Sequence, residues 1–391
     1  MEQGHRLHVI ANPIIPTDPN ICTDPFNIKI IKFCRMFHRR GHYIIFYGVN
    51  ECKNMVQCSE YHGIIGINEY DEAKRISNNF THPNYMLIDN QDICGQISQK
   101  MWNKFGELLI PHLNTNYKKG DIVIHMVDDY APSNFNCPMI HIDGGKGGGY
   151  YSIYKNAVFE TYEYMKTFYK YLERNKEYCK IHNQKIIYPW FYPEDFTFNP
   201  DKRDNTYLYM ARCQKYKGLH IFLHLSTLIN ATFIIAGGCA SWNPQTKILE
   251  TGEIQDGKVV TFDLNLYPNV KYIGIADYNT RKHLLSTVKA LIQPTQYIEP
   301  CGWNVIESMM CGTPVLVSSF GGFLDTVIHG KTGFMCEFNV HPSPKLYDEW
   351  IKYIDKLDGL DPYVIRQYAI DKFSEDNAYQ KYLQLFSQAE I

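Results

Sequence analysis

Short apolar segments alternate with amphipathic helical patterns along this chain of 391 residues, and the alternation starts afresh in the second half. The apolar segments of the first half are RLHVIANP, YIIFYG, YMLID (85–89), DIVIHMV (121–127) and PMIHI (138–142), with helical patterns over 26–40 and 91–113. Apolar strands separated by helices predict a parallel sheet that helices cover on both faces. The first half therefore predicts a Rossmann-like α/β domain.

The second half repeats this pattern with different residues. Its apolar segments are TYLYMAR, TFIIAGG, VKYIGI and ALIQPT, with helical patterns over 218–230 and 279–289. An aromatic-rich helix expected over 157–176 and the Pro-rich connector KIIYPWFYPEDF separate the halves, which places the domain junction near residue 184. We expect a first domain over 1–184 and a second Rossmann-like domain over 185–370. Ligands of such sheets bind beyond the carboxyl ends of the strands.

Charge and cysteine content exclude several classes of protein. The 39 basic and 41 acidic residues give a net charge of −2, so no overall positive field would recruit nucleic acid. The twelve cysteines form no C-x-x-C pair, which indicates neither a zinc knuckle nor a disulfide framework. They are typical of buried, reduced thiols.

The N-terminus MEQGHRLHVIANP lacks the charged-then-apolar pattern of a signal peptide, and no apolar run approaches the roughly 20 residues of a membrane span. We therefore expect a soluble cytoplasmic protein without a transmembrane segment. The thirty tyrosines and the abundant Asn, Ile and Lys suggest an AT-rich genome, such as that of a large DNA virus, in which case the compartment is the host cytoplasm.

The stretch 299–322, EPCGWNVIESMMCGTPVLVSSFGG, predicts a loop, a short helix and a buried strand. Glu299 and Glu307 lie on either side of the expected helix start, where Gly302 and Trp303 stand. A helix N-terminus attracts phosphate, and a carboxylate one turn further in can accept hydrogen bonds from neighbouring hydroxyl groups. A nucleotide sugar offers both groups, whereas the simpler interpretation is an amphipathic helix with a solvated Glu.

Two cations follow the first strand of the second domain. TYLYMAR ends at Arg212, and Lys217 begins the next helical pattern. This pair could stabilise the charge that develops on a diphosphate leaving group, a task that many enzymes give to a divalent metal. The chain has no D-x-D triplet, so we expect no metal cofactor. By itself R-x-x-x-x-K is a weak pattern, and a solvated pair is the alternative.

A glycine run and a basic helical pattern in the first half each allow more than one interpretation. The glycine run 144–149 fails the spacing of a phosphate loop and is interpreted as a loop that approaches a ligand or the other domain closely. The helical pattern 26–40 carries five cations, which could make a weak peripheral contact with anionic lipid but more simply form a solvated face.

The motifs of residues 206–335 together resemble glycosyltransferase family 4. They are Arg212…Lys217-Gly218, Ala236-Gly237-Gly238, Asn269-Val270…Gly274, Glu299-Pro300-Cys301-Gly302…Glu307…Gly312-Thr313-Pro314-Val315, Gly321-Gly322 and Gly330-Lys331-Thr332-Gly333. This family is retaining and metal-independent and has the GT-B fold, in which two Rossmann-like domains face each other across a deep cleft. The ending SEDNAYQKYLQLF resembles the last helix of the family, which implies that 371–391 crosses back to the first domain.

The resemblance also implies a role for each matching residue. Arg212 and Lys217 would hold the donor diphosphate, and Glu307 the ribose hydroxyls. Glu299 and the backbone N–H groups of Cys301, Gly302 and Trp303 would hold the transferred sugar. The backbone near Gly274 and Ile275 would meet the base, and Gly238 belongs to the same donor-binding set.

The first domain departs from the family pattern. Many members have a glycine pair after the first strand, where this chain has Asn12-Pro13-Ile14-Ile15-Pro16. Many also place a histidine near the end of a central strand against the sugar. His141 together with Asp143 is the preferred candidate and His125 the alternative, although a lone histidine in a strand is more often a core residue.

We therefore expect an enzyme that moves a hexose from a UDP- or GDP-sugar to a glycan or lipid-linked acceptor with retention, as in glycan biosynthesis. A sugar-nucleotide epimerase on the same architecture and a non-catalytic nucleotide- or glycan-binding protein are the alternatives. Donor base, donor sugar, acceptor and oligomeric state are left open by the sequence.

Overall fold

The chain folds into two compact units, seen in a computed structural model that describes residues 4–11, 17, 25–65, 91–126, 139–142, 156–174, 183–201, 203–337 and 344–389. The first unit holds the described residues up to Pro189 together with the C-terminal segment from Glu375, and the second holds Trp190–Ser374. The expected strand YMLID and the glycine run 144–149 lie outside the described residues.

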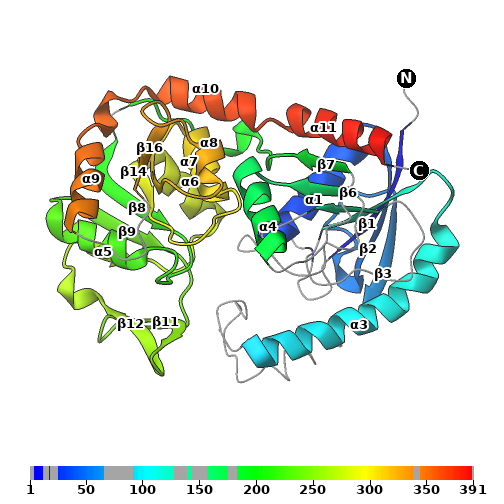
Figure 1. Ribbon diagram of the computed structural model, residues 1–391, viewed down its shortest axis with the longest axis horizontal. Helices are drawn as coiled ribbons and strands as arrows, with labels where there is room; N and C mark the ends of the chain where they lie inside the picture. Colours follow the sequence, from blue (N-terminus) through cyan, green and yellow to red (C-terminus); the bar gives the residue numbers. More distant parts are fainter. Residues whose placement is uncertain are drawn as a thin grey trace. The chain divides into compact units, whose positions relative to one another are not determined.

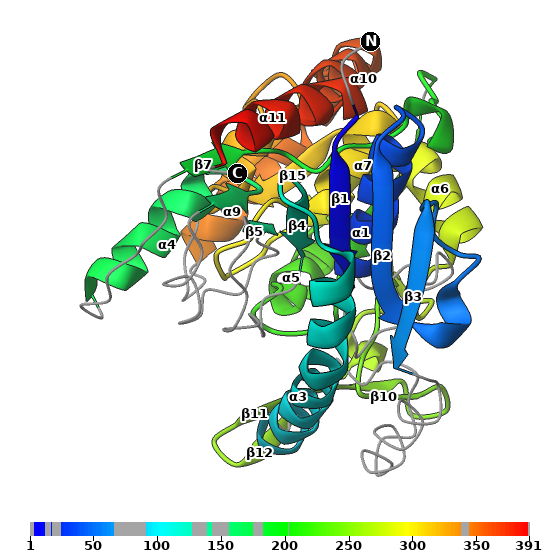
Figure 2. The same cartoon turned by 90° about the vertical axis from the view of Figure 1, so that its right-hand side faces the viewer.

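The first unit is built on a parallel sheet of seven described strands in the order β3-β2-β1-β4-β5-β6-β7. Its elements are β1 (Arg6–Ile10), α1 (Pro25–His38), β2 (Tyr43–Val49), β3 (Glu60–Ile65), α3 (Gln91–Asn116), β4 (Ile122–His125), β5 (Met139–Ile142), β6 (Asn156–Phe159), α4 (Tyr162–Arg174), β7 (Asn183–Ile186) and α11 (Glu375–Gln388). Figure 2 shows β1, β2 and β3 side by side. The order 3-2-1-4 at the centre is that of a Rossmann-like sheet, with its switch point between β1 and β4.

One expected helix begins later than the sequence pattern suggested. Residues Asn156–Phe159 form strand β6, which pairs in parallel with β5 and β7, and α4 starts only at Tyr162. Ala157, Val158 and Phe159 are buried in this strand. A short apolar run fits a buried strand as well as a helix, and only the neighbouring strands decide between them.

The C-terminal helix α11 packs against α1 in the first unit. The rings of Phe33 and Tyr382 meet edge to face with centroids 5.2 Å apart. Arg39 and Arg40, which follow α1, both bond to Glu375, and Lys29 of α1 pairs with Glu160 at a buried position. Three of the five cations over 26–40 thus pair with carboxylates of the same unit, which disfavours the possible contact with anionic lipid.

The second unit has a six-stranded parallel sheet in the order β13-β9-β8-β14-β15-β16, of which Figure 1 labels β9, β8, β14 and β16. Its elements are β8 (Asp204–Met210), α5 (Leu219–Leu228), β9 (Thr232–Ala236), β10 (Ser241–Asn243), β11 (Ile248–Gln255), β12 (Lys258–Asp263), β13 (Val270–Tyr272), α6 (Tyr278–Thr287), β14 (Val288–Gln293), α7 (Trp303–Met310), β15 (Val315–Ser318), α8 (Phe323–Thr326), β16 (Gly333–Cys336), α9 (Pro344–Ile354) and α10 (Pro362–Lys372). When these six strands are numbered by their order in the chain, their order across the sheet is 3-2-1-4-5-6. The order reverses between strands 1 and 4, so the switch point lies between β8 and β14.

Apolar side chains from α5, α9 and the sheet form one continuous core in the second unit. Helices α6 and α7 pack on each other and on the opposite face of the sheet, and α10 packs on α7 (Figure 1). Burial on both faces explains why strands such as Val315–Ser318 are apolar throughout rather than alternating. The core therefore fixes which loops meet at the carboxyl edge of the sheet.

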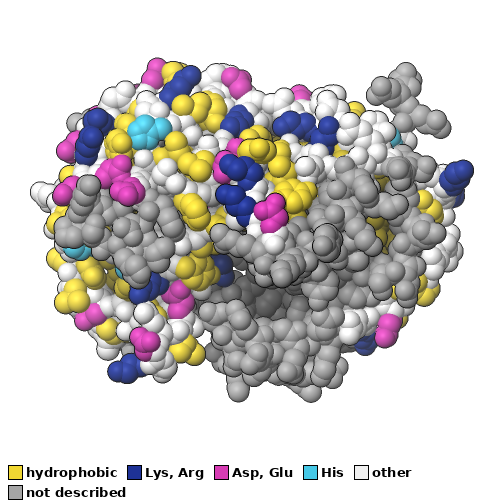
Figure 3. All heavy atoms as spheres, in the orientation of Figure 1, with side chains coloured by type: hydrophobic (Ala, Val, Ile, Leu, Met, Phe, Trp, Pro, Cys, Tyr) yellow, Lys and Arg dark blue, Asp and Glu magenta, His cyan; other side chains and the backbone are white. Residues whose placement is uncertain are grey.

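Charged side chains of both signs are intermixed over the described part of the face that Figure 3 shows. This distribution agrees with the nearly balanced composition of the chain. No helix in the described ranges combines the length and hydropathy that a membrane crossing requires. The eight cysteines whose side chains the structure describes are free thiols.

Candidate active site

The two expected cations lie on the loop that leaves β8 at the switch point. The hydroxyl of Tyr209 donates to the carbonyl of Arg212 (2.7 Å), and the N–H of Cys213 donates to the carbonyl of Gly238 (2.8 Å). The loop ends at Gly218, which has φ +82° and caps α5. A Cβ at Gly218 would lie 1.9 Å from the carbonyl oxygen of Pro294, so the loops after β8 and β14 touch here.

A compact cluster of three side chains joins these two loops and consists of Lys217, Tyr297 and Glu299. The Lys217 ammonium donates to Glu299 Oε2 at 3.0 Å and also to the Tyr297 hydroxyl. The Tyr297 hydroxyl in turn donates to the same carboxylate oxygen at 2.8 Å. The side chains of Lys217 and Glu299 are 12% and 15% exposed, so each charge is nearly enclosed and depends on the other.

Burial lowers the pKa of Lys217, and the positive charge of Arg212 acts in the same direction. The carboxylate of Glu299 opposes both effects by its charge and its hydrogen bond. Burial also raises the pKa of the Tyr297 hydroxyl well above its usual range, with Glu299 adding to that shift. Tyr297 therefore stays a neutral hydrogen-bond donor at physiological pH.

Replacement of Glu299 by Gln is expected to make Lys217 lose its proton at a lower pH. The carboxylate raises the pKa of Lys217, so its removal lowers that pKa further. An ammonium that binds a phosphate is present below the pKa and is lost as the pH rises through it. The alkaline limb of nucleoside diphosphate affinity, measured by calorimetry at several pH values, should therefore move to lower pH in Glu299→Gln. An unchanged limb would contradict the coupling, and Glu250→Gln, an exposed residue of β11, is the control.

Glu299 and the start of α7 are held by close backbone contacts. The N–H of Gly322 donates to the carbonyl of Glu299 (2.7 Å), and a Cβ at Gly322 would lie 2.3 Å from the carbonyl oxygen of Pro300. Gly302 has φ +81° and caps α7, where Cys301 is buried and Trp303 is the first helical residue. The turn thus directs the free N–H groups of an eight-residue helix toward the switch point.

Asn304 ties this helix to both central strands, a role that the sequence pattern did not reveal. Its amide donates to the carbonyl of Met210, the last residue of β8 (2.6 Å), and to Gln293 Oε1 at the end of β14 (3.0 Å). Only the fold brings the two partners of Asn304 together.

Glu307 is engaged by a second residue that sequence reasoning missed. Nε of Arg281, on α6, donates to Glu307 Oε2 at 2.6 Å, and its Nη2 donates to the same oxygen. The Glu307 side chain is 13% exposed. Arg281 therefore orients the Glu307 carboxylate by binding one of its two oxygens, and the position of the other oxygen is fixed with it. This is the carboxylate that we expect to accept hydrogen bonds from hydroxyl groups.

The residues expected near the base lie on the loop after β13. Gly274 has φ +74°, and its carbonyl accepts the N–H of Gly237 at 2.8 Å. Ile275 is 39% exposed. This loop is joined to the loop after β8 through the glycine pair that ends β9, since Gly238 accepts from Cys213.

The structure describes the candidate sugar contacts of the first unit to different extents. His125 is fully buried at the end of β4, and burial lowers its pKa to about 3, so it is a neutral core residue and not a sugar contact. His141 lies in β5 opposite His125 in the pairing register, but its side chain is not described. Asp143 and the segment 12–16 lie outside the described residues.

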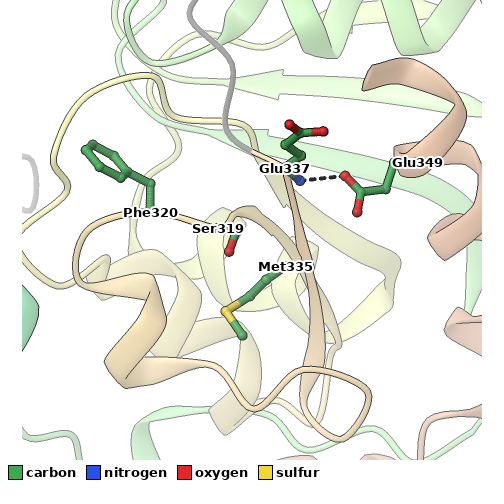
Figure 4. Close-up of a pocket in the computed structure, with 5 residues that line it drawn as sticks. All are labelled: Ser319, Phe320, Met335, Glu337 and Glu349. Atoms are coloured by element: carbon green, nitrogen blue, oxygen red, sulfur yellow. Dashed lines mark hydrogen bonds between the residues drawn. The ribbon is translucent and has the colours of Figure 1, made fainter. Parts of the chain in front are cut away.

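A separate open pocket of about 570 Å³ lies at the carboxyl ends of β15 and β16. Its lining residues are Ser319, Phe320, Met335, Glu337 and Glu349. Figure 4 shows the Glu349 carboxylate reaching the backbone N–H of Glu337, at 2.6 Å. None of the expected donor contacts lines this pocket, although the chain passes directly from Phe320 to Gly321, which lies against Glu299.

Comparisons with known proteins agree with this arrangement. Residues 193–357, which hold the whole Lys217–Glu299 cluster, match the family described as glycosyl transferases group 1. An uncharacterized glycosyltransferase of Methanocaldococcus jannaschii is 24% identical over 358 residues, which cover 83% of each chain. Residues 193–357 therefore form a glycosyltransferase domain, and the chain has the GT-B fold.

The fold of this glycosyltransferase agrees with solved structures over nearly its full length. A glycosyltransferase from Rickettsia africae superposes with a TM-score of 0.66 at 15% identity, covering 99% of this chain and 98% of the other. HepE from Anabaena, solved with UDP-glucose, superposes with a TM-score of 0.57 at 13% identity, covering 98% and 99%. Sucrose synthase 1 from Tulipa gesneriana is 23% identical over 208 residues, and this chain covers only 25% of its length.

Proposed function

We propose that this glycosyltransferase moves a hexose from a UDP- or GDP-sugar to a glycan or lipid-linked acceptor, with retention of configuration and without a divalent metal. The observation that carries the proposal is the enclosed Lys217 ammonium beside Glu299 at the switch point of the second sheet. This is the edge at which Rossmann-like sheets bind nucleotides. The Anabaena protein of the same fold, solved with UDP-glucose, supports a nucleotide-sugar donor.

In the proposed mechanism, Arg212 and Lys217 bind the diphosphate and stabilise the charge that develops as the sugar leaves. Arg212 is exposed at the loop and lies with its guanidinium carbon 5.7 Å from the centre of the Tyr216 ring, whereas Lys217 is nearly enclosed. A cation in an environment that excludes water interacts more strongly with a developing anion than one in bulk solvent. The N-terminus of α7 adds its N–H groups to the same charge, so these residues supply the electrostatic stabilisation that a metal provides elsewhere.

Glu299 and Glu307 would contact hydroxyl groups and not act as acid and base. Glu299 already accepts hydrogen bonds from Lys217 and Tyr297, so its carboxylate serves as a hydrogen-bond acceptor in this cluster. Glu307, oriented by Arg281, would accept from the ribose hydroxyls. Retention and metal independence follow the resemblance to glycosyltransferase family 4 and are tested by the anomeric configuration of the product and by activity in a chelator.

Calorimetric titration with UDP, GDP and ADP tests the donor site. We expect one of these nucleotides to bind wild type, and Arg212→Ala to weaken that binding by about 10- to 100-fold, because a charge-assisted contact to phosphate contributes roughly 1.5–3 kcal/mol. Lys215→Ala is the matched control, since Lys215 lies on the same loop and its exposed ammonium is bonded to Gln255 of β11. Binding of no nucleotide, or equal effects of the two substitutions, would contradict the proposal.

A further inference from the structure

The connection between the parallel strands β9 and β13 contains a small antiparallel sheet where such crossovers usually have a helix. Strands β10, β11 and β12 pair in that order, and the hairpin of β11 and β12 extends away from α5 (Figure 1). Its two turn residues, Asp256 and Gly257, have φ +51° and +73°, which is the geometry of a type I′ turn. This hairpin lies in the chain between the glycine pair after β9 and the expected base loop.

A β-bulge in this hairpin turns one carboxylate out of the ladder. The pairing of β11 with β12 shifts between Glu250 and Ile254, and Gly252 within the shift has φ +81°. The buried Thr251 hydroxyl donates to the carbonyl of Val260 and accepts the N–H of Glu253, each at 3.0 Å. Bulges are found next to active sites, where they redirect a side chain. Here the redirected residue is Glu253.

The Glu253 carboxylate binds the backbone of the loop between the two cations. Its Oε2 accepts the N–H of Lys215 at 2.5 Å, and its Oε1 lies 3.5 Å from the N–H of Tyr216. The neighbouring Gln255 accepts from the Lys215 ammonium at 2.9 Å. The hairpin therefore holds the backbone of this loop through Glu253, whereas the contact between Lys215 and Gln255 is exposed to solvent.

Tyr216 links that backbone contact to the rest of the site. Its carbonyl accepts the N–H of Gln296 at 2.7 Å, and its ring meets the Tyr297 ring edge to face at 5.5 Å. The guanidinium carbon of Arg212 lies 5.7 Å from the centre of the same ring. A shift of the backbone at 215–216 would therefore move Arg212, Tyr297 and, through Tyr297, Lys217.

We propose that Glu253 is a positioning residue that holds the loop 212–217 in its donor-binding shape before the nucleotide arrives. The inference rests on the proposed function. Successive backbone N–H groups in a turn can form a nest that binds an acceptor oxygen. With the carboxylate in that nest, the loop is preorganised and presents the Arg212 and Lys217 side chains to the diphosphate, which raises affinity by reducing the ordering cost of binding.

Hydrogen exchange and nucleotide titration on the full chain test this role. In Glu253→Ala without nucleotide, we expect the amides of 213–218 to exchange at least about ten-fold faster, because their backbone bonds open locally. The affinity for the nucleoside diphosphate that binds wild type best should fall by about ten-fold. Glu253→Gln keeps an oxygen for the Lys215 N–H and should stay within about three-fold of wild type in both measurements. Glu250→Ala, three residues earlier on the exposed side of the same strand, should resemble wild type.

The outcomes separate the inference from the function on which it rests. Unchanged exchange in Glu253→Ala, or faster exchange with unchanged nucleotide affinity, would overturn the positioning role. Loss of affinity in Glu253→Gln equal to that in Glu253→Ala would also overturn it, since the role requires an acceptor and not a charge. If wild type binds no nucleotide, the proposed function and the donor-side role both fail, while the exchange rates still decide whether Glu253 holds the loop.

Discussion

Lys217→Ala is expected to lower the rate of donor turnover by about 10²- to 10³-fold, since loss of one preorganised donor to a developing anion typically has this effect. Its ammonium is nearly enclosed and bonded to Glu299, so water cannot replace it efficiently. The variant also leaves Glu299 without its cation, which adds a buried, unpaired charge to the defect. The measurement is release of nucleoside diphosphate from a panel of nucleotide sugars without added acceptor.

Lys215→Ala is the matched control for this prediction because it removes an ammonium two residues away that is exposed and bonded to Gln255. It should keep the wild-type rate within about two- to three-fold, as expected for an exposed polar contact. A Lys217→Ala enzyme with more than a tenth of the wild-type rate would contradict the role of Lys217 in stabilising the leaving group. An equal loss in the control would show that net charge on the loop matters more than position.

Gly218→Ala is expected to destabilise the second unit by about 2–5 kcal/mol. The positive φ of +82° contributes about 1–2 kcal/mol of strain for a residue with a Cβ. The added Cβ would lie 1.9 Å from the carbonyl oxygen of Pro294, and overpacking of this kind costs about 1–3 kcal/mol more. Since the contact joins the loops after β8 and β14, nucleotide binding should weaken together with the stability measured by urea denaturation.

Gly330→Ala separates the two contributions to this effect. Gly330 has φ +76°, but a Cβ there would have no heavy atom within 4 Å. This control should lose only the strain of about 1–2 kcal/mol. If Gly218→Ala is no more destabilising than Gly330→Ala, the two loops do not approach each other as closely as the distance to Pro294 requires.

The sequence predicted the sheets well where apolar strands and helical patterns were long. Strands β8, β9, β14 and β15 and helices α5, α6 and α7 lie within a few residues of their expected positions. The antiparallel hairpin of β11 and β12 was missed, although Asp256-Gly257 between two strand-like segments is a recognisable turn signal. Residues 157–159 were expected in a helix, because a short apolar run does not distinguish a helix from the strand that the structure shows without its neighbours.

The sequence predicted which charged residues belong to the candidate site, but not all of the side chains that contact them. Glu299 and Lys217 were expected in one site, and the structure joins them directly at 3.0 Å. The partners Tyr297 and Arg281 carry no motif that would select them from the chain. His125, a candidate from its place in a strand, is enclosed by the core, because burial depends on what packs on both faces of the sheet.

By itself, the sequence determined the class of fold, the switch-point loops and the charged residues that they carry, because local periodicity and glycine positions specify strands, helices and turns. The tertiary structure alone decided which of those charges are paired, enclosed or oriented. Lys217 and Glu299 are 82 residues apart in the chain, Arg281 and Glu307 are 26 apart, and Glu253 and Lys215 are 38 apart. Such contacts depend on how strands from distant parts of the chain are ordered in the sheet, and the environment that they create sets the pKa of Lys217 and the shape of its loop.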